Sequence, residues 1–352
     1  MKKFVADTKL YIVVLLAALC LVTWGLVVGS MPVSFGDKKP VRVMITQGAT
    51  ARTIADTLQK SGIIRSPMVF LLTSKMGGVS EKLKPGVYEM SRAMSTPEIV
   101  RSLVQGNTLE SWVTIPEGKT LREIADILAA KQLADADTFL GLTTLQGDRF
   151  ASYSLPYDGN LEGYLFPDTY LIERGTTTDD VIKMMLDTFE RKVVKAHRDE
   201  IETVIKSRFG LGANQFDYGL RRVLIIASII EREAKTADDR PKIAAVIWNR
   251  LSKNMKLEID ATVTYRLGES RANKAKVYYR DLENSSLYNT YRHAGLPPAP
   301  ICNPGLASIL ATLRPADIDA LYYVAKKDGS HVFNRTLAEH NASKKAKKEG
   351  NL

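Results

Sequence analysis

The chain has 352 residues, of which 45% are hydrophobic and 25% are charged, and its formal net charge is +10. These are the proportions of a globular protein, and they exclude a disordered, collagen-like or coiled-coil chain. Basic residues are scattered apart from a C-terminal cluster at 344–348. The sequence therefore lacks the basic stripe with interleaved aromatic side chains that nucleic-acid binding needs.

The first predicted element is a transmembrane helix at 10–29. This segment contains no charged residue. Its length matches the roughly 20 residues that a helix needs to span a bilayer. A cleaved signal peptide is the alternative, but it has an apolar core of roughly 7 to 15 residues and a small-residue cleavage site. Because the tail at 1–9 carries Lys2, Lys3 and Lys9, the positive-inside rule predicts a cytoplasmic N-terminus and an extracytoplasmic chain.

An internal repeat follows a predicted linker at 30–40. The segment 45–58 matches the segment 115–128 residue type by residue type at most positions. Each copy reads as a strand, a glycine turn, a threonine N-cap (Thr50 or Thr120) and a helix with one apolar face. Each copy is therefore predicted to open a small βα module.

A second helix is predicted from Pro67, a strand at 84–90 and a third helix at 96–102. The strand, helix, helix, strand order resembles a LysM domain, a small fold that binds polymers of N-acetylglucosamine. This resemblance predicts a LysM-like subdomain at 41–108. The alternative is a common βα arrangement without glycan binding. A second βα module and a connecting region are predicted at 109–160.

The segment 161–170 combines aromatic residues with glycine, proline and acidic residues. Aromatic faces pack against the C–H surfaces of sugars, and carboxylates bind hydroxyl groups. Glu162 and Tyr164 are therefore candidate substrate-binding residues. A packed aromatic core is the alternative for this cluster.

A predicted helix ending near residue 235 carries the most informative carboxylate. Residues 223–230 are apolar on all sides, which is typical of a helix buried on most of its circumference. Glu231 follows on the face of Ala227 and Ser228, whose small side chains would leave room for a substrate. Burial raises the pKa of a carboxyl, as a general acid requires. The alternative is an exposed ion pair with Lys235, worth about 0.3 to 0.5 kcal/mol.

Glu233 is a competing carboxylate on the same helix. It lies two residues beyond Glu231, and hence about 200° around the helix axis. At most one of the two carboxylates can therefore point into a given cleft.

Further polar and aromatic residues stand at loop-like positions beyond this helix. We expect the following to contact a substrate: Asp260, Thr262, Tyr288, Asn289, Tyr291 and His331. His331 and His340 are not expected to bind a metal, because metal sites need three or more converging ligands. No cofactor is predicted.

At this point the chain resembles the YceG-like family of endolytic murein transglycosylases. The matching strings occur in family order at 161–170, 227–233, 260–265, 288–291, 295–305, 329–333 and 339–341. Two departures are Ala261, where many members have proline, and Cys302, where members have a smaller residue.

The resemblance implies an enzyme that cuts within peptidoglycan strands and leaves a 1,6-anhydro-N-acetylmuramoyl end. It places the catalytic glutamate on Glu231, which would protonate the leaving oxygen and then accept the proton of the C6 hydroxyl. Two rival hypotheses remain: a non-catalytic glycan-binding scaffold of a wall-synthesis complex, and a hydrolase that uses water with Asp260 as second carboxylate.

The predicted fold class is α+β: a transmembrane helix, a LysM-like α+β subdomain, and a mixed α+β catalytic domain at 161–342 before a basic tail at 343–352. The predicted location is the bacterial inner membrane, with the catalytic domain in the periplasm. The expected partners are glycan strands and peptidoglycan polymerases, the latter implied by the family and the tether, with a role in ending strand elongation.

Overall fold

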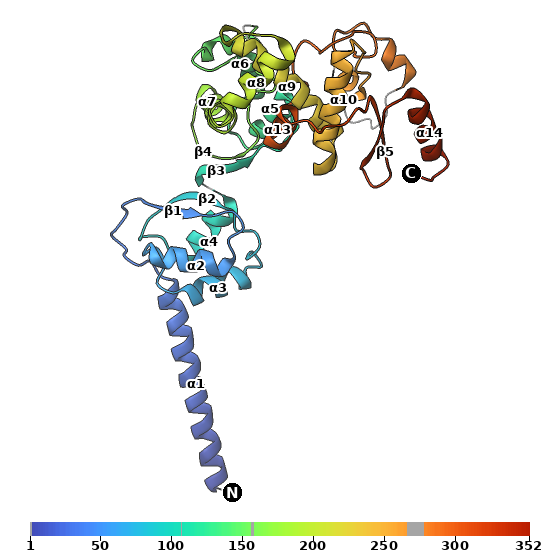
Figure 1. Cartoon of the computed structure of the whole chain (residues 1–352). Helices are drawn as coiled ribbons and strands as arrows, with labels where there is room; N and C mark the ends of the chain where they lie inside the picture. The colour runs from blue at the N-terminus through green and yellow to red at the C-terminus, as the bar shows by residue number, and fades with distance from the viewer. Residues whose placement is uncertain (1, 107, 156–157, 266–277) are drawn as a thin grey trace. The chain divides into compact units, whose positions relative to one another are not determined.

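The computed structural model describes residues 2–106, 108–155, 158–265 and 278–352, with side chains not described at 2–15, 108–110, 148 and 279 (Figure 1). It divides into two compact units, residues 1–113 with 170–175, and residues 114–169 with 176–352. The mixed α+β class predicted from the sequence is confirmed.

The helices of the first unit and the strands of its sheet are α1 (Lys2–Ser30), β1 (Val41–Ile45), α2 (Ala51–Lys60), α3 (Pro67–Met76), β2 (Gly86–Met90), α4 (Thr96–Gln105), β3 (Thr108–Thr114) and β4 (Thr169–Glu173). The elements of the second unit are α5 (Leu121–Ala130), α6 (Ala136–Thr144), α7 (Thr178–Phe189), α8 (Arg198–Phe209), α9 (Phe216–Glu233), α10 (Arg240–Ser252), α11 (Asp260–Thr264), α13 (Leu306–Leu313), β5 (Tyr322–Ala325), β6 (His331–Asn334) and α14 (Leu337–Lys348).

The first unit is built on a four-stranded sheet of order β1-β2-β3-β4. Strands β1 and β2 are antiparallel, with Val41 opposite Met90 and Ile45 opposite Gly86. Helices α2 and α3 connect these two strands, which gives the strand, helix, helix, strand order expected from the sequence. The core of this unit contains apolar residues of both strands and all three short helices, including Val43, Leu58, Phe70, Tyr88 and Leu103.

The two copies of the sequence repeat have the predicted local structure. Gly48 and Gly118 have φ angles of 78° and 77°, a region that glycine enters without steric cost. Thr50 caps α2 by accepting a hydrogen bond from the Thr53 amide, and Thr120 caps α5 in the same way. A β-hydroxyl acceptor at this position satisfies an amide that the helix leaves unpaired.

The end of α1 packs on α3. A Cβ placed on Gly29 would lie 2.6 Å from Cγ2 of Val69, so the small residue allows this close approach. The next residues are fastened to the same unit, because Arg65 donates hydrogen bonds to the carbonyls of Pro32 and Val33. Among the residues that the structure describes, no helix is long and apolar enough to span a membrane.

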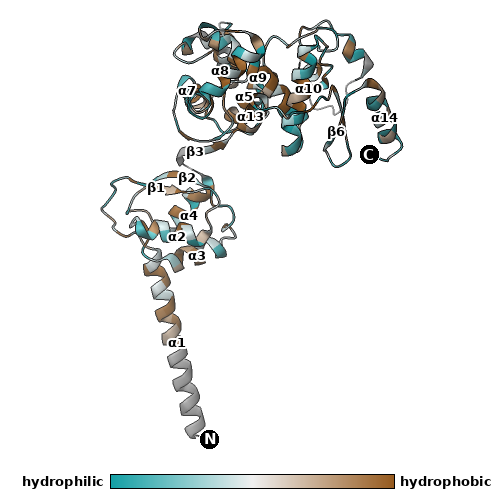
Figure 2. Cartoon of the chain, viewed as in Figure 1, coloured by the Kyte–Doolittle hydropathy of each residue, from teal (hydrophilic) through white to brown (hydrophobic). Residues whose placement is uncertain are grey.

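The second unit is organised around α9, which packs against α8, α10, α11 and α13. Figure 2 shows the apolar character of α9, as expected for a helix with neighbours on several sides. Its core contains Ile226 and Ile230 from α9 with Ile243, Ile247 and Trp248 from α10. This buried helix places its C-terminal carboxylates between packed elements.

The C-terminal part of the chain is a β-hairpin covered by a helix. Strands β5 and β6 are antiparallel, and α14 packs on both. Thr336 and Glu339 form a capping box at the start of α14. Since α14 continues to Lys348, the whole basic cluster at 344–348, assigned from the sequence to a tail at 343–352, belongs to an ordered helix.

Candidate active site

The two glutamates at the end of α9 lie in different environments. They are separated by about 200° around the helix, as the sequence analysis expected. Glu231 contacts α13, whereas Glu233 lines a pocket on the side of β5 and α14.

Glu231 is held entirely by internal contacts. Its Oε2 accepts hydrogen bonds from the Gly305 amide at 3.1 Å and from the Ser308 hydroxyl at 2.8 Å, and its Oε1 lies 3.8 Å from Nη2 of Arg240. Gly305 is the N-cap of α13, so the carboxylate lies where a helix N-terminus favours negative charge. Its side chain is 8% exposed. These contacts fix α9 against α13.

A second carboxylate, Glu117, lies beside this contact. A Cβ on Gly305 would come within 1.9 Å of Oε1 of Glu117, so this position requires glycine unless Glu117 moves. Burial and the neighbouring charge of Glu231 raise the pKa of Glu117, while Arg240 opposes the shift.

The space over the small residues before Glu231 is occupied by protein. Ala227 and Ser228 are completely buried. The Ser228 hydroxyl accepts a hydrogen bond of 3.0 Å from the Ile301 amide, and the Cys302 thiol donates to the Ser228 carbonyl. The prediction that these residues leave room for a substrate is therefore wrong, because their small size admits the segment 301–303 instead.

Glu233 lies in the wall of a pocket of about 920 Å³. The pocket is lined by Glu233, Arg250, Leu257, Glu258, Ile259, Asp260, Tyr291, Leu321, Tyr322, Tyr323, Val324, Leu337, His340, Asn341, Lys344, Lys347 and Lys348. These residues come from α9, from α10 and the loop after it, from the start of α11, from the loop at 291, from strand β5 with the residue before it, and from helix α14. Such a concave site with convergent polar groups is the usual form of a ligand-binding pocket.

The electrostatics of this pocket favour a protonated Glu233. Burial is the main cause that raises the pKa of Glu233 to about 7, and the nearby charge of Asp260 adds to the increase. The Tyr323 hydroxyl donates a hydrogen bond of 3.1 Å to Oε2 of Glu233, and this bond lowers the pKa. A carboxyl with a pKa near neutrality can both donate and accept a proton at pH 7.

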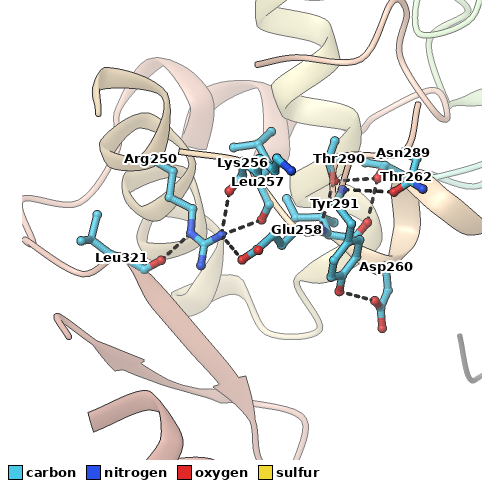
Figure 3. A network of polar contacts seen from close by, with 11 residues as sticks. Arg250, Lys256, Leu257, Glu258, Asp260, Thr262, Asn289, Thr290, Tyr291 and Leu321 are labelled. Carbon is cyan, nitrogen blue, oxygen red and sulfur yellow. Dashed lines mark hydrogen bonds and ion pairs between the residues drawn. The ribbon is translucent and has the colours of Figure 1, made fainter. Parts of the chain in front are cut away.

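Asp260 and Tyr291 form a hydrogen-bonded pair in the same wall. The Tyr291 hydroxyl donates to Oδ1 of Asp260 at 2.6 Å (Figure 3). Burial and Asp260 together raise the pKa of the Tyr291 phenol well above its usual value. The phenol therefore remains a hydrogen-bond donor across the physiological pH range.

Arg250 holds the loop that carries Asp260 (Figure 3). The residue is 7% exposed. Its guanidinium donates to the carbonyls of Lys256, Leu257 and Leu321, at 2.8, 3.1 and 2.6 Å, and to the Glu258 carboxylate at 3.0 Å. A planar guanidinium with five donors can satisfy several fixed acceptors at once.

Thr262 and Asn289 lie behind the pocket wall. Thr262 is completely buried, and its hydroxyl contacts the Thr290 hydroxyl at 2.9 Å and the Ile259 carbonyl at 2.7 Å. Asn289 is also buried, donates to the carbonyls of Leu282 and Asn284, and accepts from the Tyr291 amide. Their polar atoms are used to connect the loops.

Tyr288 packs its ring against Tyr265, with centroids 5.1 Å apart. The Tyr265 hydroxyl donates a hydrogen bond of 3.1 Å to Oε2 of Glu162. Neither Tyr288 nor Glu162 lines the Glu233 pocket.

Glu162 and Tyr164 are both buried, and Glu162 lies at the start of α5. The Glu162 carboxyl accepts hydrogen bonds from the Leu121 amide and the Asn303 side chain, and burial raises its pKa to about 8. The Tyr164 ring packs edge-on against Phe189, with centroids 5.6 Å apart. Both residues belong to the packed interior, which is the alternative stated above for this aromatic segment.

His331 supports the Tyr323 ring. Its Nδ1 lies 3.0 Å from Oδ2 of Asp239, and both side chains are 4% exposed. The rings of His331 and Tyr323 meet edge to face at 5.3 Å. Among the described residues, no group of three or more His, Cys, Asp or Glu side chains is arranged to hold a metal ion.

Of the predicted site residues, Asp260 and Tyr291 line one pocket and Thr262 and Asn289 connect its loops. Glu233, Tyr323 and Asn341 line the same pocket and are absent from the site residues predicted from the sequence. One signal for Glu233 was available, since it is the second of two carboxylates at opposite sides of a buried helix.

The second unit is thus a mixed α and β domain with an ionisable carboxyl in a polar and aromatic pocket, as in a general acid-base enzyme. The chain belongs to the YceG-like family, whose sequence profile matches residues 43–346. It is 35% identical over 330 residues to a protein of Bacillus subtilis named endolytic murein transglycosylase, with 89% of this chain and 86% of that protein covered.

Two further comparisons support membership of the same family. A Streptococcus pneumoniae protein of the same name is 31% identical over 348 residues, which cover 89% of this chain and 61% of that longer protein. A crystal structure of a yceG-like protein from Listeria monocytogenes matches with a TM-score of 0.57 and 34% identity, covering 87% of this chain and 99% of that one. The shared name of these relatives, endolytic murein transglycosylase, denotes a lyase.

Proposed function

We propose that the chain is an endolytic murein transglycosylase. It cleaves the bond between N-acetylmuramic acid and N-acetylglucosamine within peptidoglycan strands and leaves a 1,6-anhydro end. Family membership and the names of the relatives support this activity. The observation that carries the proposal is the Glu233 carboxyl, which lines a pocket and whose pKa is raised to about 7.

The mechanism needs one carboxyl. Protonated Glu233 donates its proton to the leaving glycosidic oxygen as the bond from that oxygen to C1 breaks. The resulting carboxylate accepts the proton of the C6 hydroxyl, whose oxygen forms the new bond to C1. Glu233 ends the cycle protonated, and no water is consumed.

In this proposal Glu233 takes the role that the sequence analysis assigned to Glu231. The Glu231 carboxylate accepts hydrogen bonds from Gly305 and Ser308 and forms an ion pair with Arg240. We therefore assign it a positioning role, in which it holds the last turn of α9 and so fixes Glu233.

The substitutions Glu233→Gln and Glu231→Gln form a matched pair. The first is expected to reduce kcat on purified sacculi by about 10²- to 10⁴-fold, the usual contribution of a general acid-base group. The second is expected to reduce thermal stability more than the chemical step. Mass spectrometry of released muropeptides, with a melting curve for each variant, measures both effects. If Glu231→Gln alone abolished the anhydro product in a folded protein, Glu231 would be the acid.

A water-using muramidase is a second candidate, because Asp260 lies in the wall of the same pocket as Glu233. Digestion in ¹⁸O-labelled water distinguishes the two reactions. The transglycosylase gives an anhydro end without the label, whereas the hydrolase incorporates it at C1. Full activity of the Glu233→Gln variant in wall maintenance would instead favour a non-catalytic scaffold.

We further propose that residues 10–29 anchor the chain in the bacterial inner membrane with its second unit in the periplasm. The uncharged sequence of this segment and the preceding lysines support an anchor, and the first unit would hold glycan strands as a LysM-like module does. An anchored cutter would end the elongation of strands near peptidoglycan polymerases. Extraction of membranes with alkaline carbonate tests the anchor, since release of the full-length chain contradicts it.

A further inference from the structure

One wall of the Glu233 pocket is basic. Helix α14 contributes Lys344, Lys347 and Lys348 to this wall, together with Asn341. The carboxylates of Glu233 and Asp260 belong to other elements that line the same pocket. The pocket therefore combines an acidic catalytic wall with a wall of lysines, which we call the lysine wall.

The lysine wall is a feature of one helix face. The residues of α14 that line the pocket are Leu337, His340, Asn341, Lys344, Lys347 and Lys348, and spacings of three and four residues place side chains on one side of a helix. The helix is held in place, because the Ser343 hydroxyl bonds Oδ1 of Asn334 at 3.0 Å and the His340 ring stacks on Tyr322 at 5.0 Å. Its lysines therefore face the pocket on a fixed scaffold.

The charges of the lysine wall are not neutralised by the protein. Within the described ranges, no carboxylate lies within 4.0 Å of the ammonium groups of Lys344, Lys347 or Lys348. On the same helix, Lys345 points elsewhere and pairs with Glu349 at 3.9 Å. Three unpaired cations beside a pocket attract anionic groups.

We propose that the lysine wall binds the carboxylates of the stem peptides that muramic acid residues carry, so that the enzyme prefers strands with free peptide carboxylates to the same strands with those carboxylates amidated. This inference rests on the proposed function. The sugar backbone of a peptide-bearing strand has no charge, because the lactyl carboxyl is in amide linkage, and its anionic groups are the peptide carboxylates. The ammonium group of lysine is a compact charge on a flexible side chain, so it suits carboxylates whose positions vary from one peptide to the next.

The test compares two triple variants of the full-length chain with equal loss of charge. The first is Lys344→Gln, Lys347→Gln and Lys348→Gln. The control is Lys195→Gln, Lys253→Gln and Lys345→Gln, three exposed lysines that do not line the pocket. Each is assayed on unmodified peptide-bearing strands and on the same strands after carbodiimide coupling of the peptide carboxylates to methylamine, which keeps the peptides in place and removes their negative charge.

The first variant is expected to raise KM for the unmodified strands by about tenfold, the combined effect of three exposed charge pairs, with kcat unchanged. Its KM for the amidated strands should equal that of the wild type. Salt should weaken the wild-type preference, since exposed charges are screened over about 10 Å at 0.1 M ionic strength. The control variant should keep the wild-type preference.

Three results would overturn the inference: a wild type that does not distinguish the two substrates, a first variant that weakens both equally, or a first variant that loses only binding to vesicles containing anionic lipid. Binding of both strand types is also measured with the Glu233→Gln substitution in each background. The binding measurement does not depend on cleavage. A preference for strands with free peptide carboxylates, without any anhydro product, would therefore reject the proposed reaction and keep the lysine wall.

Discussion

The Tyr323 hydroxyl donates a hydrogen bond of 3.1 Å to the Glu233 carboxylate, and the two residues come from strand β5 and the last turn of α9. This bond lowers the pKa of Glu233, while burial and the charge of Asp260 raise it to about 7. The net effect keeps the carboxyl close to the midpoint of its titration at neutral pH. Because the causes act in opposite directions, they can be tested separately.

Removing the Tyr323 hydroxyl should extend activity to higher pH. A general acid is active while protonated, so the rate falls as pH rises through the pKa. The Tyr323→Phe substitution removes a bond that lowers the pKa of Glu233, and a bond of about 1 kcal/mol corresponds to roughly 0.7 pH units. The alkaline limb of the pH profile of kcat/KM measures the shift. Tyr322→Phe is the control, and an unmoved or lowered limb for Tyr323→Phe would contradict the assignment.

The Asp260→Asn substitution should have the opposite effect. It removes a negative charge that raises the pKa of Glu233, so the alkaline limb should move to lower pH. Asparagine retains an acceptor for the Tyr291 hydroxyl, which limits structural disturbance. Glu258→Gln, in the same wall, is the matched control. Complete loss of activity at every pH would instead favour Asp260 as the base of a hydrolase.

Arg250 should be important for stability. The Arg250→Met substitution leaves the buried Leu257 carbonyl and the part-buried carbonyls of Lys256 and Leu321 without their donor, and we expect a loss of about 2 to 4 kcal/mol in the free energy of unfolding. Urea denaturation followed by circular dichroism measures this loss. Lys253→Met, at an exposed position beside it, should change stability by less than about 0.5 kcal/mol. Equal effects of the two substitutions would show that the contacts in Figure 3 contribute little.

Gly163 combines a backbone constraint with close packing. Its φ is 94°, and a Cβ would lie 2.6 Å from Cγ of Pro300. Gly295 has a φ of 86° but open space at the Cβ position, so Gly295→Ala isolates the backbone cost of about 1 to 2 kcal/mol. Gly163→Ala should lower the free energy of unfolding by about a further 1 to 3 kcal/mol, because the Pro300 ring cannot easily move away from the new methyl group. Thermal melting of both variants checks the difference, and equal melting temperatures would refute it.

Local features of the fold could be predicted from the sequence. Glycine turns and threonine caps mark the start of α2 and α5, because their geometry depends on neighbouring residues. The apolar run at 223–230 predicted the buried helix α9, and the spacing of Glu231 and Glu233 predicted that they would face apart. The local pattern did not show where the basic residues after 343 would lie, since their helix is fixed by contacts with β5 and β6.

The choice between the two glutamates could not be made from the helix alone. The sequence determined that a buried helix ends in two ionisable carboxyls on opposite faces, since helical periodicity is a local property. Only the tertiary structure decided that α13 and Arg240 occupy the Glu231 side and that β5, Asp260 and α14 enclose a pocket on the Glu233 side. The physical reason is that desolvation and charge, which set a pKa, come from residues distant in the chain.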